Sequence, residues 1–230
     1  MITLRKANDR GRANFGWLDS KHTFSFGSYY DPRHMGFSKL RVINDDVVAG
    51  GKGFDTHGHR DMEIISYVLE GSIEHQDSAG NVQVLPAGEF QLMSAGKGIF
   101  HSEYNARKNK PLRFLQIWIE PNVFGQKPGY QQKAFGKAEG LTTIITPTGE
   151  NGTLQIKQQA TLHQLILAPG DELTFEPDSA KVYIHQVEGK LHVNNVQLTS
   201  GDGAKINGEN KLLLTNSGSK QVTALVFELP

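Results

Sequence analysis

The sequence predicts an all-β protein built as two consecutive β-barrels. The chain has 230 residues and 25 glycines, and these glycines stand between short runs of β-branched and aromatic residues, as strand-ending turns do. Helical periodicity of apolar residues is scarce. Many short strands separated by Gly, Pro, Asn and Asp are typical of barrels and sandwiches, and an internal repeat favours two barrels.

Ten strands are predicted from runs rich in Val, Ile, Leu, Phe and Tyr that are bounded by turn residues. They cover residues 39–44, 63–69, 72–77, 91–94, 112–119, 141–146, 162–167, 182–187, 211–216 and 222–229.

The internal repeat consists of three matches that occur in the same order in both halves of the chain. Residues 67–73 resemble 183–191, 84–89 resemble 197–202, and 112–121 resemble 222–230. Chance similarity between strand–turn patterns is the alternative, and the shared order argues against it. We therefore expect domains at residues 1–125 and 126–230, joined by the glycine-rich stretch 121–140.

The composition excludes several classes of protein. Lys+Arg and Asp+Glu both total 24, so the formal net charge is zero and neither nucleic acid nor an anionic membrane is indicated as a partner. The absence of cysteine excludes disulfides and iron–sulfur sites. No apolar run has the length of a membrane span, and the polar start of the chain lacks a signal-peptide core. A cytoplasmic location is expected.

Two short motifs carry metal-binding residue types. His57-Gly58-His59 and His101-Ser102-Glu103 are both i, i+2 pairs, and alternate side chains of a strand share one face. Two such strands side by side in a barrel would bring three imidazoles and one carboxylate to a common point. This donor set suits iron, manganese, nickel, copper, cobalt or zinc and offers no soft ligand.

A lone His-x-His pair often occurs by chance, so the second pair carries much of the weight. Glycines also crowd both pairs, as expected where the backbone approaches a site closely; they are Gly51, Gly53, Gly58, Gly96 and Gly98. We therefore predict that His57, His59, His101 and Glu103 bind one divalent transition metal. Because unperturbed imidazole titrates near pH 6.5, metal loss on mild acidification is expected.

The second repeat serves as an internal comparison. Counting from the shared turns places Phe175 and Pro177 at the positions of the first pair, and Leu214 and Asn216 at those of the second. None of these side chains matches the ligand it replaces. We expect the C-terminal barrel to hold no metal.

The other titratable residues are weaker candidates. Glu63 lies four residues after His59 and could orient a ligand, although an exposed position at the start of a strand is an equal alternative. The remaining histidines lack a partner at ligand spacing and are expected on the surface or hydrogen-bonded in the core; they are His22, His34, His75, His163, His185 and His192.

The chain resembles the pirin family of the cupin superfamily. The resemblance runs through most of the N-terminal half, and the C-terminal half matches more loosely as a degenerate second cupin. The matching segments are residues 10–11, 15–18, 22–26, 41–46, 57–59, 67–71, 75–78, 93–96 and 99–103. Gly58 and Asp61-Met62 stand where many relatives have Pro and Gly-Phe, a departure that spares the ligands.

The resemblance implies a monomeric bicupin with jelly-roll-type barrels and iron(II) held by His57, His59, His101 and Glu103. It also implies quercetin 2,3-dioxygenase activity, that is, flavonoid degradation by cleavage of a flavonol at C2–C3 with O₂ and release of carbon monoxide. Glu103 would be a ligand or the catalytic base for the substrate's 3-hydroxyl. The alternative is a metal-dependent protein-binding module, a transcriptional cofactor without turnover. A different reaction at the same site is a third possibility, because fold does not fix function.

Overall fold

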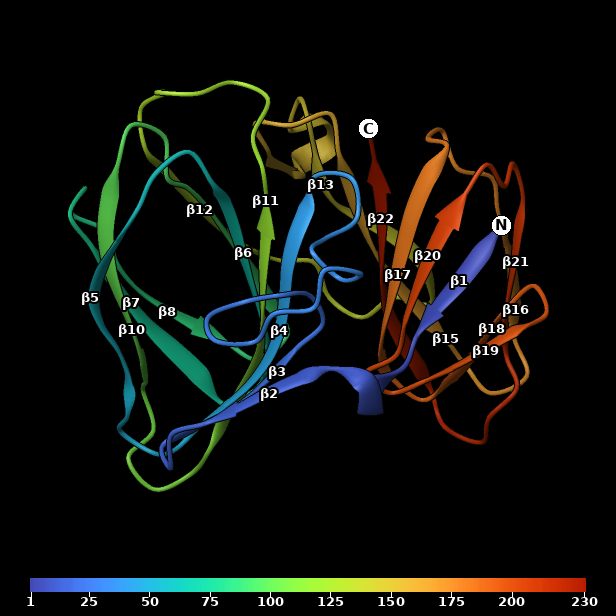
Figure 1. The fold of residues 1–230 in the computed structure, drawn as a ribbon, viewed down its shortest axis with the longest axis horizontal. Helices are drawn as coiled ribbons and strands as arrows, with labels where there is room; N and C mark the ends of the chain where they lie inside the picture. The colour runs from blue at the N-terminus through green and yellow to red at the C-terminus, as the bar shows by residue number, and fades with distance from the viewer. The chain divides into compact units, whose positions relative to one another are not determined.

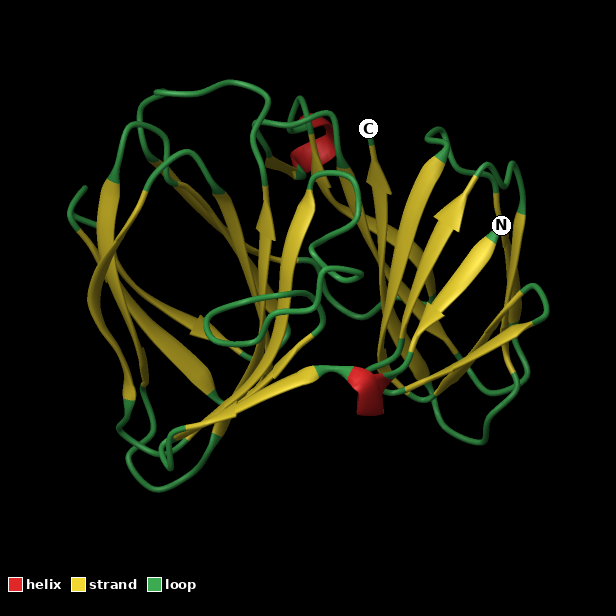
Figure 2. Cartoon of the chain, viewed as in Figure 1, coloured by secondary structure: helices red, strands yellow, loops and turns green.

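The computed structural model describes residues 1–230, and nearly all of the regular structure is β-strand (Figures 1 and 2). The exceptions are two short 3₁₀ helices, Ala7–Asp9 and Glu150–Gly152. The all-β prediction is confirmed. No helix is both long and apolar enough to cross a membrane.

The chain forms two compact units. One comprises residues 11–136 together with 156–158, and the other comprises residues 1–10, 137–155 and 159–230. The division therefore falls later than residue 125. The first ten residues go with the C-terminal unit because the strand β1 (Ile2–Arg5) pairs there with β20 (Gly203–Asn207).

Two antiparallel sheets make up the N-terminal barrel. The seven-stranded sheet has the order β12-β9-β6-β11-β4-β3-β2 and the four-stranded sheet the order β5-β10-β7-β8. The bounds are β2 Gly11–Asn14, β3 Leu18–His22, β4 Leu40–Val48, β5 Gly53–His59, β6 Glu63–Glu70, β7 Ser72–Asp77, β8 Val82–Pro86, β9 Glu89–Ser94, β10 Ile99–Asn105, β11 Leu112–Ile119 and β12 Gly129–Ala134.

The C-terminal barrel has the same two-sheet construction. Its seven-stranded sheet runs β1-β20-β17-β22-β15-β13-β14 and its four-stranded sheet β16-β21-β18-β19. The remaining bounds are β13 Gly140–Thr146, β14 Leu154–Gln155, β15 Thr161–Leu167, β16 Glu172–Phe175, β17 Lys181–Glu188, β18 Lys190–Val193, β19 Val196–Thr199, β21 Leu212–Asn216 and β22 Val222–Leu229. Both ends of the chain lie in this barrel (Figure 1).

The predicted repeat is confirmed in the backbone. Gly71 follows β6 and Gly189 follows β17, and both have φ = 87°. Gly88 and Gly201 precede β9 and β20 with φ of 88° and 87°. These left-handed conformations favour glycine, so the same turn chemistry recurs at the same place in both barrels.

All ten predicted strands are present, with ends that differ by a few residues. The predicted connection at residues 121–140 is not entirely a loop, because it contains β12, which pairs antiparallel with β9 in the N-terminal barrel. Three of the six residues of β12 are Gln or Lys, so hydropathy gave no signal for it.

The interior of the N-terminal barrel has three layers because each strand contributes alternate residues. On β6, Val68 belongs to one apolar cluster, which also contains Val48 and Phe114, and Ile64 belongs to a second one, with Met93 and Ile99. Between them lies Ser66, which is opposite Gln116 of β11 and Gln91 of β9. Gln116 is in turn opposite Asn44 of β4. A polar belt therefore crosses the barrel between two apolar layers, and the candidate site lies at its edge.

Candidate metal centre

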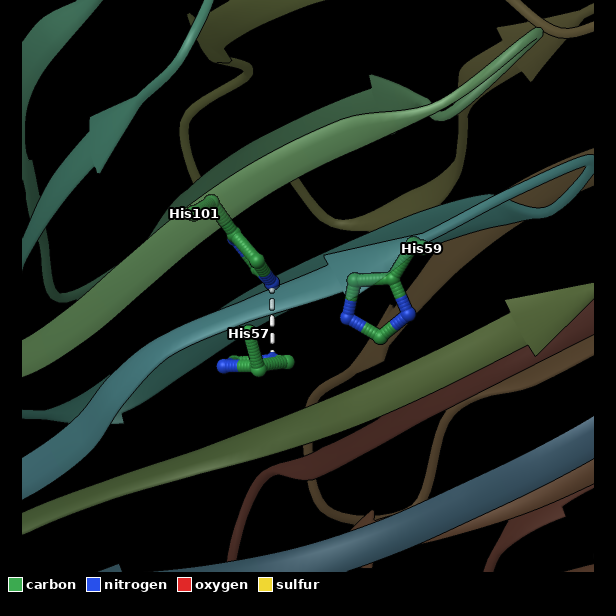
Figure 3. A group of neighbouring side chains, drawn as sticks. All are labelled: His57, His59 and His101. Carbon is green, nitrogen blue, oxygen red and sulfur yellow. Dashed lines mark hydrogen bonds between the residues drawn. The ribbon is translucent and has the colours of Figure 1, made fainter.

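The strands β5 and β10 bring the predicted ligands together. They pair antiparallel with His57 opposite His101, and His59 lies two residues along β5 on the same face. Figure 3 shows the three rings converging from these two strands. Their centroids are 4.5–4.9 Å apart. The convergence that the spacing predicted for the histidines is present.

The separation of the ring nitrogens fits ligation of one cation. The Nε2 atoms of His57 and His101 are 3.0 Å apart (Figure 3). Metal–imidazole bonds of about 2.1 Å at a right angle place two nitrogens roughly 3.0 Å apart. Each of the three imidazoles offers a nitrogen within 4.8 Å of the others.

The tautomer of His57 supports the same interpretation. Its Nδ1 lies 2.7 Å from the carbonyl oxygen of Asp55, and since a carbonyl only accepts, Nδ1 carries the proton. The lone pair of His57 is then on Nε2, facing His101. Such a hydrogen bond from the outer ring nitrogen is what orients metal-binding histidines. A proton or a cation is needed between the two facing nitrogens.

Burial keeps two of these histidines neutral, as ligation requires. Burial, followed by the neighbouring His101 and His57, lowers the pKa of His59 to about 4. Burial, followed by His57 and His75, lowers the pKa of His101 to about 3.

Glu103 lies next to this group but is turned toward the polar belt. A register irregularity on the β5 side separates His101 from Glu103. The carboxylate accepts hydrogen bonds from Gln116 Nε2 at 2.9 Å and from Ser66 Oγ at 3.3 Å. Its oxygen clusters with ring nitrogens of His101 and His75 within 4.8 Å. Glu103 therefore shares His101 with the three-histidine group without being part of it in this conformation.

His75 is a site residue that the sequence analysis passed over. It lies opposite Glu103 in the β7–β10 pair, its side chain is fully buried, and its Nε2 is 3.0 Å from Asp77 Oδ2. The signal was available: His75 and Asp77 are an i, i+2 pair on a predicted strand, like the two ligand pairs. His75 was instead counted among the histidines without a partner at ligand spacing and was expected on the surface or hydrogen-bonded in the core.

Glu63 has different partners. Its carboxylate accepts hydrogen bonds from Ser94 Oγ at 2.8 Å and from the Lys157 amide at 3.2 Å, and burial raises its pKa. Among the other histidines, His163 of the C-terminal barrel lies between Glu228 and Thr143, a hydrogen-bonded core position of the kind expected.

A cavity of about 240 Å³ opens beside the histidines. Aromatic rings form much of its wall, and the rings of His59 and Trp118 are 5.0 Å apart. The lining residues are Phe26, Asn44, Asp46, Phe54, His57, His59, Glu103, Gln116 and Trp118. Two imidazoles, three aromatic rings and four polar side chains therefore face the same space.

The C-terminal barrel is apolar at the corresponding place. Asn216 Nδ2 donates to carbonyls of Leu167 and Lys220 and its Oδ1 accepts from the Gly218 amide. Asn105 at the end of β10 has the same pattern. Asn216 thus corresponds to Asn105, not to Glu103, because the stretch from the glycine turn to this asparagine is two residues shorter in the C-terminal barrel. Leu212 and Leu214 then occupy the positions of His101 and Glu103, and Leu212 pairs with Phe175.

Comparisons with known proteins agree with this architecture. Residues 3–119 match the family profile described as Pirin, and residues 143–229 match the one described as Quercetinase C-terminal cupin domain. Together they span most of both barrels.

Full-length relatives are known from Escherichia coli. A protein of strain K12 called quercetin 2,3-dioxygenase is 47% identical over 231 residues, covering 100% of this chain and 99% of the relative. The crystal structure of YhhW from the same species superposes with a TM-score of 0.97 at 47% identity, covering 100% of this chain and 98% of that one. A complex of bacterial pirin YhhW with nickel(II) gives 0.96 at 46% identity, covering 100% and 99%. This chain belongs to the pirin family.

Proposed function

We propose that the protein is a metal-dependent dioxygenase that cleaves a flavonol such as quercetin at C2–C3 with O₂. The observation that carries this is the convergence of His57, His59 and His101 at the wall of an aromatic-lined cavity. The full-length relative called quercetin 2,3-dioxygenase in Escherichia coli supports it. That name also favours an enzyme over a protein-binding module without turnover.

The proposed cofactor is one divalent transition metal, with iron(II) as the first candidate. Its ligands are His57, His59, His101 and Glu103. Manganese, nickel, copper, cobalt and zinc suit the same nitrogen and oxygen donors, and the nickel(II) complex of the Escherichia coli pirin supports a divalent cation. If Glu103 binds the metal, it gives up the longer of its two hydrogen bonds, the one that Ser66 Oγ donates at 3.3 Å.

When bound, the metal supplies Lewis acidity toward the 3-hydroxyl of the substrate. The residues of the chain do the rest. Phe26, Phe54 and Trp118 hold the planar rings and exclude water from the cavity. In its alternative role, as base rather than ligand, Glu103 takes the proton of the 3-hydroxyl, which leaves an electron-rich enolate. O₂ then reacts with that enolate, and the C2–C3 bond breaks with release of carbon monoxide.

The test uses protein loaded with iron(II) under exclusion of air and then mixed with quercetin in aerated buffer. Quercetin absorbance, dissolved O₂ and carbon monoxide are followed together. Loss of quercetin and O₂ in equal amounts, with release of carbon monoxide, is expected for the wild type and not for His101→Ala. Unchanged absorbance and O₂ with every divalent metal tried would rule out the proposal.

The monomeric state implied by the family resemblance stays a prediction, which sedimentation of the metal-loaded protein tests. Glu103→Gln separates the enzyme from the alternative role: turnover is lost if Glu103 is the base, whereas binding of a protein partner would survive.

A further inference from the structure

Two polar side chains of the cavity wall have hydrogen-bonding atoms that no protein group satisfies. Asn44 and Asp46 lie two residues apart on β4, so both face the barrel interior. They are 3% and 4% exposed. The Oδ1 atoms of both are buried without a hydrogen-bond partner. The only other polar atom of this kind on the wall of the cavity that holds His57 and His59 is Trp118 Nε1.

A buried acceptor without a partner costs folding free energy, and native proteins keep few of them. Asp46 has a single side-chain hydrogen bond, to Ser20. Apolar side chains would fill the same volume at lower cost, as Val48 does two residues further along the same strand. Two such acceptors on the wall of one cavity indicate that their partner belongs to whatever fills the cavity.

The charges around Asp46 limit what that ligand can be. The ionisable groups that act on it electrostatically are Asp45 and Glu103, both acidic. Asp45 is neutralised by Arg113, 2.9 Å away, but no cation faces Asp46. A carboxylate or phosphate would be repelled here. A neutral ligand with hydroxyl donors satisfies both acceptors.

The two walls of the cavity belong to different sheets. His57 and His59 are on β5 of the four-stranded sheet, whereas Asn44 and Asp46 are on β4 of the seven-stranded sheet. Packed sheets lie about 10 Å apart. A ligand that reaches the histidines with one end can therefore present a hydroxyl on its other end to β4.

We propose that Asn44 and Asp46 are the specificity-determining residues of the site, and that they select flavonols bearing phenolic hydroxyls away from the 3-hydroxyl. Asp46 accepts the hydrogen bond of such a hydroxyl, and Asn44 accepts from a second one or from a bridging water. The inference rests on the proposed function, because it assumes that the 3-hydroxyl is the end held near the histidines.

The test compares quercetin with 3-hydroxyflavone, which keeps the 3-hydroxyl and lacks the others. For the wild type at pH 8, where Asp46 is mostly ionised, we expect kcat/KM to favour quercetin roughly 10- to 100-fold, as one hydrogen bond to a charged acceptor allows. Asp46→Leu and Asn44→Leu should lose that preference because kcat/KM falls more for quercetin than for 3-hydroxyflavone. Gln91→Leu is the matched control: Gln91 also has a buried unpaired atom in the belt but does not line the cavity, so the preference should persist.

Calorimetric binding of both flavonols to the metal-free protein gives a second readout. Tighter binding of quercetin that is lost in Asp46→Leu supports the inference even if the wild type consumes neither compound, which would refute only the proposed function. Equal preference in wild type and variants, by rate and by binding, overturns the inference. If Asp46→Leu does not fold, Asp46→Ala also removes the acceptor and serves in its place.

Discussion

The Nε2 atoms of His57 and His101 lie 3.0 Å apart across the β5–β10 pair. With the proton of His57 held on Nδ1 by the Asp55 carbonyl, its lone pair faces the other ring. Either the Nε2–H of His101 donates to that lone pair or a cation lies between the rings, and the third imidazole, His59, beside both rings favours the cation.

Replacing His57 or His101 with alanine should abolish stoichiometric metal binding. Each substitution removes one nitrogen from a set that is 4.8 Å across at most, and even losing a residue that only orients a ligand costs about 10- to 100-fold in affinity. Elemental analysis should give one metal per wild-type chain and far less for the variants. His192→Ala, in the C-terminal barrel, should keep the full amount. One metal per chain in His57→Ala would contradict the assignment.

Gln116→Leu should weaken metal binding and turnover through Glu103. The variant removes the donor 2.9 Å from Glu103 Oε2 and leaves only Ser66 to hold the carboxylate. A loss of roughly 10- to 100-fold in metal affinity is expected, measured by competition with a chelator. Gln158→Leu removes the hydrogen bond to the Glu120 carbonyl and should lower stability without changing the affinity for metal. Equal affinities for metal in the two variants would mean that Gln116 does not position Glu103 for metal binding.

Much of this arrangement could be predicted because β-structure has a period of two. The alternation alone implied that His57 and His59 share a face, and the three ordered matches of the internal repeat implied two barrels. The strands β5 and β10 were inferred from ligand spacing, since the interior face of β5 carries histidines where hydropathy looks for Val or Ile.

The remainder depended on which strands become neighbours. His75 joins the site only because β7 pairs with β10 on the side away from β5. Asn44 and Asp46 line the cavity from a different sheet, which no local pattern reveals. The orientation of Glu103 is set by Ser66 and Gln116, which lie 37 and 13 residues from it in sequence.

The metal-free protein should lose stability on acidification. The pKa values of His59 and His101, about 4 and about 3, lie below the usual 6.5. Below pH 6.5 the unfolded chain therefore binds protons that the folded chain does not, and the free energy of unfolding falls until the pH reaches the folded values. Urea unfolding of the metal-free protein at pH 7 and pH 5 measures this.

The double variant His59→Gln/His101→Gln should show a smaller change in the free energy of unfolding between these pH values. An equal change would mean that other groups cause the effect.

The low pKa values of His59 and His101 also affect how firmly the protein keeps its metal as the pH falls. Protons compete with the metal for these two nitrogens only at a lower pH than for ordinary imidazole. Bound metal should therefore persist below pH 6.5. The sequence alone had implied that metal is lost on mild acidification.

Asp46 should act on stability with the opposite sign. Burial, and then the charges of Asp45 and Glu103, raise its pKa from 3.8 to about 7. Between these values the folded chain holds a proton that the unfolded chain has lost, so the free energy of unfolding falls as the pH rises through this window. A shift of this size corresponds to about 4 kcal/mol at most. Asp46→Asn should therefore stabilise the protein more at pH 8 than at pH 5.

Thermal unfolding at the two pH values checks this. Asp19→Asn is the control, because the hydrogen bond from Arg12 lowers the pKa of Asp19 and its removal should not stabilise at either pH. A gain for Asp46→Asn that is the same at pH 5 and pH 8 would show that Asp46 does not titrate in this range.

Gly53→Ala should disturb the metal centre without touching a ligand side chain. A Cβ at position 53 would lie 2.3 Å from the carbonyl oxygen of Glu103 and 2.5 Å from the Cα of Tyr104. Both are backbone atoms of β10, so β5 and β10 must separate beside Glu103. We expect a lower unfolding temperature and weaker metal binding. Gly129→Ala on β12, where a Cβ meets nothing within 4 Å, should change neither quantity. Undiminished metal binding in Gly53→Ala would mean that the site tolerates movement between these strands.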